Sequence, residues 1–391
     1  MQILFLYRCR TEDVKTGLSK CKFLILKVGI GMRVAIIGAG LAGLSCAYQL
    51  KKYGITPDIF EKRSAVGNLL EHTICTLNIF DRTLMNPIKY LKKKYKLNIV
   101  PLSPLTEITM IAPNKKTIVK GRNLGYVFKR GYEKYSLEKQ IESKLGLPIS
   151  FNTYIKIDDI KDSYDRIIVA TGDNSIAKDM GVWTTSYTFQ VRVATVLGNF
   201  KKGSIKMWLN TGYAKNCYCY LLANNSKEAR LVLALNSVSH QDLDYYWKEF
   251  LFDAEISYRI TETRDTEYNT GYPDSAQVGN ICFTGDSAGL MDDFLGFGAI
   301  RAIESGILAA RAIAEGLDYS ALVRPLQNDV KGIHEFRKAL NTFDDRDFDR
   351  LVTFLGLPFV KQFIYKNPFF KAHCGIFAAK LYNSLKYKQR L

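Results

Sequence analysis

The sequence predicts an α/β protein. A nucleotide-binding domain with a parallel sheet is interrupted by a mainly antiparallel β-sheet and followed by a helical C-terminal region. Three observations predict this fold. Residues 33–63 read as a strand, a glycine-rich turn, a helix and a second strand. Residues 183–260 are rich in strands that do not alternate with helices, and helical spacing of apolar residues prevails from Leu317 onward. With 391 residues, the chain is long enough to form two lobes.

The first of these stretches carries the most specific motif. The apolar run Val34–Ile37 meets Gly38-Ala-Gly40-Leu-Ala-Gly43, and the second apolar run ends at Glu61. Gly38 allows a tight turn, Gly40 allows the backbone to approach a pyrophosphate, and Gly43 allows the helix to lie against the sheet. The N–H groups at the start of the helix attract phosphates, and Glu61 is placed to accept hydrogen bonds from ribose hydroxyls. The stretch therefore predicts a dinucleotide site.

Composition excludes several classes of protein. No apolar run reaches the ~18 residues that predict a membrane-spanning helix. The eight cysteines and four histidines show no metal-ligand spacing, so we expect no metal site. Scattered thiols of this kind suit a reducing compartment, and we expect a cytoplasmic protein.

The chain divides into alternating segments of the two lobes. Residues 1–31 precede the first strand and lack the apolar core of a secretory signal, so we expect a poorly ordered extension. We expect the nucleotide-binding domain in three parts (32–100, 126–175 and 276–316), the inserted substrate domain in two parts (101–125 and 176–275), and a helical basic region over 317–391.

Within these segments the elements follow from local patterns. Residues 64–96 read as loop and helix, a helix is expected over 136–145, and a strand near 149–157. A buried strand then runs into the small-residue turn Ala170-Thr171-Gly172. A second buried strand ends at Gly285-Asp286, and a loop with Gly296 and Gly298 leads into a helix that begins near Ala299.

The formal net charge of +17 is not evenly spread along the chain. Residues 351–391 contain seven Lys and Arg and no Asp or Glu, interleaved with Phe, Tyr and Leu. Such a pattern is typical of contact with an anionic membrane surface or a nucleic acid, and also of a plain solvated face. Because no nucleic-acid motif accompanies the charge, we expect no nucleic-acid partner and favour peripheral contact with the inner face of a membrane.

Three stretches, in this order, resemble the flavin-binding fold of para-hydroxybenzoate hydroxylase-like enzymes. They are Gly38–Gly43 with Glu61, the Ala170–Gly172 turn, and Gly285-Asp286 with its glycine loop. Within that group the chain is most similar to the geranylgeranyl reductase family. The family's Gly-Asp-Ala-Ala-Gly, Pro-x-x-Gly-Glu-Gly and Ser-Gly-x-x-Ala-Ala patterns align without a gap to 285–310. The resemblance covers residues 32 to about 370 and implies a Rossmann-type FAD-binding domain.

The resemblance also implies roles for single residues. Ala42 and the glycines around it would hold the pyrophosphate, and Glu61 the adenosine ribose. Arg130, in Val-Phe-Lys-Arg, matches a cofactor-contacting arginine, with a surface charge as the alternative. Asp286 would hydrogen-bond the ribityl chain or bridge to the diphosphate, with a helix cap as the alternative. The remaining cofactor-contacting positions form the two later glycine turns: Gly172, Gly296, Gly298 and Ala299, the last two offering N–H groups to the N1/O2 edge of the flavin.

The sequence departs from the family pattern at three places. Asp293 replaces the loop proline, and Gly296-Phe297-Gly298 replaces Gly-Glu-Gly. The substrate-sheet pattern Tyr-x-Trp-x-Phe-Pro appears only as the run from Tyr218 to Ala223. The family's active-site cysteine has Cys75 nearby, whereas a gap-free count places His72 there. These departures leave the substrate and the reaction open.

The resemblance implies an FAD-dependent oxidoreductase that reduces carbon–carbon double bonds of an isoprenoid lipid by hydride transfer from N5 of the reduced flavin. The catalytic residues are unknown, with Cys75 and Tyr220 as candidate proton donors. No second Gly-x-Gly-x-x-Gly is present, so the electron donor, NAD(P)H or ferredoxin, is expected to act at the flavin directly or through a partner. Two alternatives remain: a flavin-dependent monooxygenase of an aromatic or alkene substrate, and a non-catalytic flavin- or lipid-binding protein.

Overall fold

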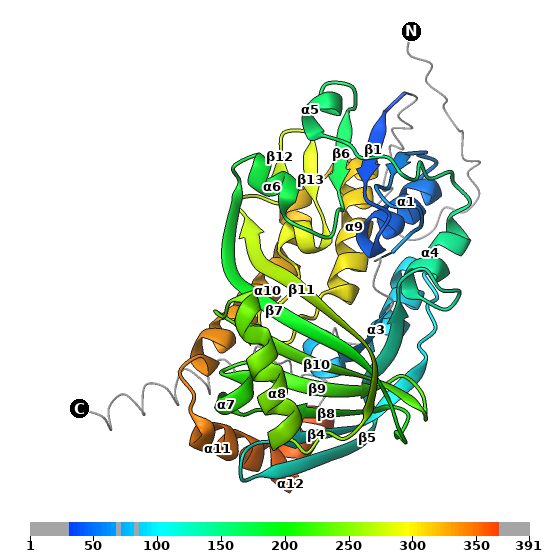
Figure 1. Ribbon diagram of the computed structural model, residues 1–391. Helices are drawn as coiled ribbons and strands as arrows, with labels where there is room; N and C mark the ends of the chain where they lie inside the picture. The colour runs from blue at the N-terminus through cyan, green and yellow to red at the C-terminus, as the bar shows by residue number, and fades with distance from the viewer. Residues whose placement is uncertain (1–30, 68–71, 82–85, 367–391) are drawn as a thin grey trace, which may run out of the picture.

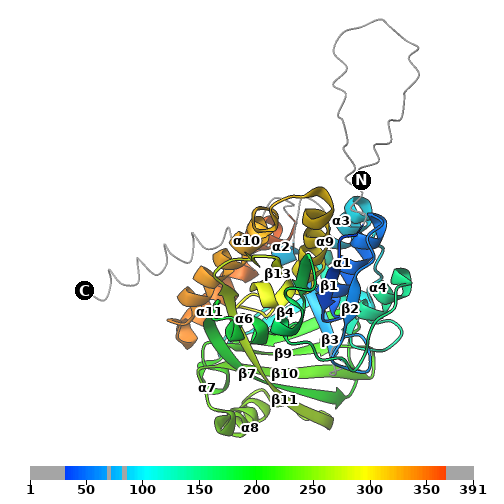
Figure 2. The same cartoon turned by 90° about the horizontal axis from the view of Figure 1, so that it is seen from above.

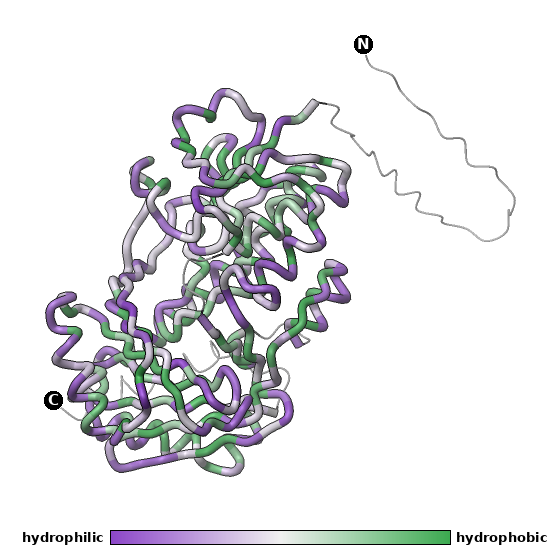
Figure 3. The backbone as a smooth tube through the Cα atoms, turned by 45° about the vertical axis from the view of Figure 1, so that its right-hand side comes forward, coloured by the Kyte–Doolittle hydropathy of each residue, from purple (hydrophilic) through white to green (hydrophobic). Residues whose placement is uncertain are grey.

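A computed structural model describes residues 31–67, 72–81 and 86–366, which form two stacked lobes (Figure 1). One lobe is built on a five-stranded sheet and the other on an eight-stranded sheet, as counted over these residues. The predicted fold class, a Rossmann-type domain with an inserted, mainly antiparallel sheet and C-terminal helices, is confirmed. Residues 1–30, on which the expected extension falls, lie outside the described residues. Hydrophobic segments run through the interior of both lobes (Figure 3).

The five-stranded sheet is the core of the nucleotide-binding lobe. Four of its strands are parallel, and the edge strand β12 is antiparallel to its neighbour. Strands β1 and β13 are buried along their whole length and β6 is buried after Arg166, as expected for a parallel sheet covered by helices. The strands in spatial order are β12 (Gln277–Val278), β13 (Ile281–Phe283), β6 (Arg166–Val169), β1 (Val34–Ile37) and β2 (Asp58–Phe60).

Two helices from distant parts of the chain cross on this sheet. They are α1 (Leu41–Lys52) and α9 (Ala299–Glu315), and α9 in turn packs against α10 (Tyr319–Leu340) (Figure 2). A Cβ atom on Gly306 would lie 2.0 Å from the carbonyl oxygen of Ala42, so only glycine permits this approach. The crossing joins the first and third segments of the nucleotide-binding lobe.

The second lobe is an eight-stranded sheet in which the parallel pair of β4 and β8 is the exception among antiparallel neighbours. The sheet is curled, as the approach of its edge strand β3 to β9 shows. The strands in spatial order are β11 (Arg259–Pro273), β7 (Trp183–Leu197), β10 (Glu228–Asn236), β9 (Tyr218–Ala223), β8 (Ser204–Trp208), β4 (Ser103–Ile111), β5 (Lys116–Arg130) and β3 (His72–Leu77).

The two faces of this sheet have different neighbours. On β10, Leu231, Leu233 and Leu235 pack into the cluster under α8, while Val232 and Ala234 point to the opposite, concave face. The remaining helical elements are α2 (Asn78–Asp81), α3 (Pro87–Tyr95), α4 (Leu137–Leu145), α5 (Ile157–Ile160), α6 (Ser175–Asp179), α7 (Thr211–Ala214), η1 (His240–Asp242), α8 (Leu243–Asp253), η2 (Gly285–Ala288), α11 (Asp345–Gly356), α12 (Pro358–Lys361) and the π-helical turn η3 (Gln362–Lys366).

Some local expectations are corrected. Part of the segment 64–96, expected as loop and helix, forms strand β3 in the eight-stranded sheet. The strand expected near 149–157 is reduced to a single bridge from Ser150 to Phe60. The long strand β11 was not expected, because as an exposed edge strand it is polar and lacks alternating hydrophobic residues. The boundary placed between residues 125 and 126 falls inside β5.

The helix crossing yields a first prediction. Gly306→Ala places a methyl group against the Ala42 carbonyl, and we expect it to lower the free energy of unfolding by about 1–3 kcal/mol. Arg311→Ala, on the same helix but in an exposed ion pair with Glu315, is the matched control and should change it by less than about 1 kcal/mol. Urea denaturation measures both, and equal stability of the two variants would contradict the role of the crossing.

Candidate functional site

A cavity of about 1590 Å³ lies between the carboxyl ends of β1, β6 and β13 and the concave face of the eight-stranded sheet. Its volume exceeds the ~300–1,000 Å³ of ordinary small-molecule sites. Of the residues expected at the cofactor, Gly43 does not line it. The expected residues that do line it are Gly38, Gly40, Ala42, Glu61, Arg130, Gly172, Asp286, Gly296, Gly298 and Ala299.

The glycines of the first motif have separate structural roles. Gly38 has a φ of 104°, and a Cβ on it would lie 2.4 Å from the Ala170 carbonyl oxygen. A Cβ on Gly43 would lie 2.0 Å from the Gly38 carbonyl oxygen, so Gly43 serves the contact between helix and strand. Gly40, at the start of α1, has no atom within 4 Å of a Cβ position. The cavity is therefore open where the N-terminus of α1 can attract an anion.

Glu61 holds the glycine turn in place. Its carboxylate accepts hydrogen bonds from the backbone N–H of Ala39 at 2.8 Å and of Arg63 at 2.9 Å. Each carboxylate oxygen has a second lone pair, so Glu61 can also accept a hydrogen bond from a hydroxyl in the cavity.

The turns at Gly172 and Asp286 lie side by side. The hydroxyls of Thr171 and Ser287 are 3.0 Å apart, and the Gly285 N–H donates to the Ser305 hydroxyl at 2.9 Å. A Cβ on Gly285 would lie 3.2 Å from that of Ala42. The third motif is thereby fixed next to the first, about 240 residues earlier in the chain.

Asp286 is the acceptor that this arrangement directs toward the cavity. Its carboxylate makes no hydrogen bond to any described residue, and one of its oxygens lies 3.3 Å from the Cβ position of Gly298. Burial raises the pKa of the Asp286 carboxyl to about 6, with the positive charge of Arg130 opposing the rise and the negative charge of Asp173 adding to it. A buried carboxylate without a partner is poised to accept hydrogen bonds from a ligand.

Arg130 stands at the same end of the cavity. Its Nε donates to the carboxylate of Glu138, which is fully buried and also accepts from the Gly131 N–H. The ion pair fixes the direction of the guanidinium, so Arg130 is an ordered part of the cavity wall and not a free surface charge.

The loop between η2 and α9 is held by a buried pair that sequence patterns did not predict. Asp292 accepts hydrogen bonds from the N–H groups of Phe294 and Leu295, and forms an ion pair of 3.4 Å with Arg301. Arg301 also donates to the Phe297 carbonyl at 2.7 Å. The pair determines where the loop ends and where the first free N–H groups of α9 meet the cavity. The spacing of Asp292 and Arg301 matches no known motif, so the sequence did not predict this pair.

A second unpredicted pair lies behind the loop. Asp293, at the position of the family's proline, is buried and pairs with Nδ1 of His334 on α10. The His334 ring lies 5.6 Å from that of Tyr187. Asp293 borders both the main cavity and a smaller one of about 270 Å³. The departure at this position thus introduces a buried polar pair beside the site.

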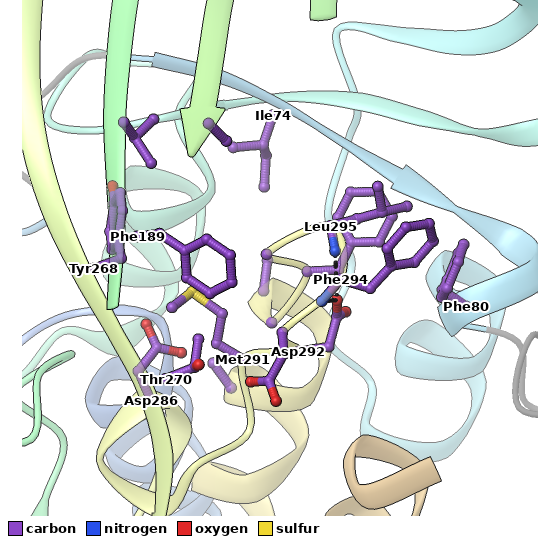
Figure 4. A pocket seen from close by; sticks show the side chains of 18 of the residues that line it. Ile74, Phe80, Phe189, Tyr268, Thr270, Asp286, Met291, Asp292, Phe294 and Leu295 are labelled. Carbon is purple, nitrogen blue, oxygen red and sulfur yellow. Dashed lines mark hydrogen bonds between the residues drawn. The ribbon is translucent and has the colours of Figure 1, made fainter. Parts of the chain in front are cut away.

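Beyond the polar residues the lining of the cavity becomes largely apolar. It begins with Phe189 and Met291, which point into the cavity close to Asp286 (Figure 4). His72, Cys75 and Tyr220 also line it, and burial, with a smaller effect of Cys75, raises the pKa of the Tyr220 hydroxyl. The apolar lining continues along Ile108, Met110, Val191, Val193, Ile205, Met207, Leu209, Val232 and Ala234 of the sheet to Phe336, Phe343, Leu351, Phe354, Leu355, Phe359, Val360, Phe363 and Ile364 of the C-terminal helices.

Comparisons of sequence match only parts of the chain. A family model described as an NAD(P)-binding Rossmann-like domain matches residues 36–73. Over 36 residues the chain is 61% identical to 15-cis-phytoene desaturase of Synechococcus elongatus, which covers 9% of this chain and 8% of that protein. Over 146 residues it is 27% identical to the methylenetetrahydrofolate–tRNA-(uracil-5-)-methyltransferase TrmFO of Lawsonia intracellularis, which covers 36% of this chain and 31% of that protein. The matches therefore span less than a third of either relative.

Comparisons of structure cover nearly all of it. A geranylgeranyl bacteriochlorophyll reductase-like protein from Thermoplasma acidophilum superposes with a TM-score of 0.68 at 15% identity, covering 89% of this chain and 96% of that one. The flavin-dependent halogenase CmlS gives 0.60 at 15% identity, covering 93% and 79%. The chain has the para-hydroxybenzoate hydroxylase-like flavoprotein fold.

Other proteins with this flavoprotein fold carry out different reactions. The 2-methyl-3-hydroxypyridine-5-carboxylic acid oxygenase superposes with a TM-score of 0.53 at 17% identity, covering 86% of this chain and 97% of that one. Reductase-like, halogenase and oxygenase proteins thus share the fold at similar, low identity. At such identity the likeness concerns the fold alone, and the reaction has to be argued from the cavity.

The two glycines of the first motif allow a matched test. Gly40→Ala adds a methyl group only to the open cavity, so we expect the protein to keep its stability within about 1 kcal/mol and to bind FAD on the order of tenfold more weakly. Gly43→Ala places its methyl group against the Gly38 carbonyl and should destabilise the fold itself. Thermal unfolding and FAD titration measure the two effects. Normal FAD affinity in a folded Gly40→Ala protein would contradict the assignment.

From the raised pKa of the Asp286 carboxyl we expect the stability of the FAD-free protein to depend on pH. The pKa of the Asp286 carboxyl is raised from 3.8 to about 6 in the folded state. Between these pH values the folded protein keeps a proton on Asp286 that the unfolded chain has lost. The contribution of Asp286 to the free energy of unfolding therefore falls as the pH rises from about 4 to about 6. Asp286→Asn should therefore be more stable than the natural protein above pH 6, by on the order of 1–3 kcal/mol, and should lose this advantage near pH 4. Chemical unfolding across this range tests it, and a difference independent of pH would contradict it.

Proposed function

We propose that this flavoprotein is an FAD-dependent oxidoreductase that reduces carbon–carbon double bonds of an isoprenoid or similar apolar chain. The observation that carries the proposal is the continuous apolar lining that leads from the loop at Gly298 to the C-terminal helices. A small aromatic substrate needs a compact pocket with a few placed polar groups, whereas an extended hydrocarbon chain needs a long apolar one.

The residues at the polar end fit FAD. The open space at Gly40 and the N-terminus of α1 suit a pyrophosphate, Glu61 suits a ribose, and the partnerless Asp286 carboxylate suits a ribityl hydroxyl. The start of α9 at Gly298 and Ala299 suits the electron-rich edge of the flavin ring. Reduced FAD supplies a hydride to one carbon of the double bond when it is bound.

The chain itself orients the substrate, excludes water and holds a proton for the second carbon. The aliphatic side chains of β4, β8 and β10 keep the cavity dry, which strengthens every polar interaction at its end. Tyr220 is one candidate proton donor, because it lines the cavity. Burial raises the pKa of its hydroxyl, which keeps the phenol protonated but makes it a weaker acid. Cys75 lies beside it as the second candidate.

A second candidate function is a flavin-dependent monooxygenase. It is favoured by the buried Asp293–His334 pair, which places a polar group at the cavity wall where an aromatic substrate could be hydrogen-bonded. Oxygen-dependent consumption of NAD(P)H, with labelled oxygen in the product, distinguishes it from the reductase. A flavin- or lipid-binding protein without turnover would stay oxidised with NAD(P)H and with reduced ferredoxin alike.

The proposal predicts a change in product mass. Under anaerobic conditions, with FAD, a chemical reductant and a polyprenyl lipid, mass spectrometry should show products heavier by about two mass units for each bond reduced, because one hydride and one proton are added. An unchanged mass across polyprenyl lipids of different lengths and headgroups would contradict the reductase function.

Two neighbouring residues of β8 test the apolar lining. Met207 faces the cavity and Lys206 faces away from it. Met207→Glu places a charge among apolar walls, so we expect polyprenyl reduction to fall by on the order of a hundredfold while FAD binding remains. Lys206→Glu carries the same new side chain on the other face and should reduce the rate by less than about twofold. Equal rates in the two variants would exclude this part of the cavity as the substrate site.

A further inference from the structure

An exposed aromatic surface lies at the C-terminal helices, at the lower edge of the molecule in Figure 1. It consists of Phe354 on α11, Leu357, Phe359 on α12 and Phe363 on η3, which we call the mouth patch. Phe359 is 79% exposed and the other three are about half exposed. The rings of Phe359 and Phe363 stack, with centroids 6.3 Å apart. Exposed apolar side chains that gather in this way mark an interaction surface.

The mouth patch is also the end of the cavity. Phe354, Phe359 and Phe363 line the cavity as well as the exterior, together with the neighbouring Val360 and Ile364. The apolar interior is therefore continuous with the apolar exterior. A chain without charge could pass from the patch into the cavity along Phe354, Val360 and Ile364, although Asp347 and Arg350 of α11 also line the cavity.

Basic residues occur on the elements of the patch and in the sequence that follows them. On α11, Arg346 and Arg350 are exposed and lie eight and four residues before Phe354, respectively, on the same side of the helix. Lys361 lies between Phe359 and Phe363 in the chain. The next 25 residues, 367–391, contain five Lys and Arg and no Asp or Glu.

The carboxylates of α11 offset the charge of its arginines, and Asp347 forms an ion pair of 3.4 Å with Arg350. The net positive charge therefore lies after α11, where residues 357–391 contain seven Lys and Arg and no Asp or Glu. Asp345 accepts a hydrogen bond from the Thr211 N–H, Asp347 from the Asp344 N–H, and Asp349 from Asn114. Aromatic side chains next to exposed cations are the combination that binds the interface of an anionic bilayer.

We propose that the mouth patch docks on an anionic lipid bilayer and that the apolar substrate enters the cavity through it. The substrate part of this inference rests on the proposed function, whereas the docking does not. No helix in the described ranges is long and apolar enough to cross a membrane. The charge around the patch favours a lipid surface over a second copy of the chain, whose identical patch would repel it.

Vesicle sedimentation with the full chain tests the docking. The natural protein should sediment with vesicles that contain phosphatidylserine, and less with phosphatidylcholine alone or at high salt. Phe359→Glu combined with Phe363→Glu should weaken this binding by on the order of tenfold. The matched control is Phe252→Glu on α8, which is 82% exposed on the other side of the sheet and should leave binding unchanged.

Each other outcome overturns the proposal. Absence of binding by the natural protein, or equal loss in the Phe252→Glu control, would exclude the mouth patch as a membrane surface. Conversion of a dimer to a monomer by the double variant in sedimentation velocity, without vesicle binding, would assign the patch to a second copy. Phe359→Ala, with an expected severalfold loss, keeps the test decisive if the double variant does not fold. Vesicle binding is measured without turnover, so the two proposals can fail separately. If only the docking proposal is wrong, the protein still reduces a substrate dispersed in detergent. If only the proposed function is wrong, the protein still binds vesicles.

Discussion

The structure depends on the close crossing of α1 and α9. The backbone of Ala42 meets Gly306, and its methyl group meets Gly285, at distances that exclude larger side chains. This contact brings the turn after β1 next to the turn after β13, although these turns are far apart in the chain. Both helices begin at the same cavity, so two sets of free N–H groups face one space. Without the crossing, each glycine turn would be an isolated strand–helix connection.

The two ends of the cavity differ in polarity. At one end, Glu61, Arg130 and Asp286 are arranged by hydrogen bonds and burial, and Asp286 keeps a carboxylate that lacks a partner in the described structure. At the other end, the aliphatic residues of β4, β8 and β10 make most of the lining apolar, with the hydroxyl of Tyr220 on β9 among them. The alternation of side chains along a strand explains why the two faces of the sheet differ. Every second residue of β8 and β10 faces the cavity, and the others pack under α8 or face solvent. The arrangement suits a polar cofactor held against an apolar substrate.

The sequence predicted the parts of the site that depend on local backbone chemistry. Gly38, Gly40 and Asp286 were recognisable because a tight turn and a close approach of the backbone demand particular residues at particular spacings. The pairs Asp292–Arg301 and Asp293–His334 were not, because they form between elements whose relative position depends on the whole fold. Strand β11 was not predicted for a related reason. Its residues are polar, and it is stabilised as a strand by its pairing with β7. Gly43 was grouped with the cofactor residues and was also expected to let the helix lie against the sheet; the structure places it at this contact between α1 and β1.

The central claim is that two distant glycine turns bind opposite ends of one FAD molecule. Hydrogen–deuterium exchange with and without FAD measures this most directly, because it reports on both turns in the same sample. The account predicts that the backbone amides of residues 38–43 and of residues 285–299 become protected together, over the same range of FAD concentration. Protection of the first turn alone, or no protection of either at saturating FAD, would contradict it.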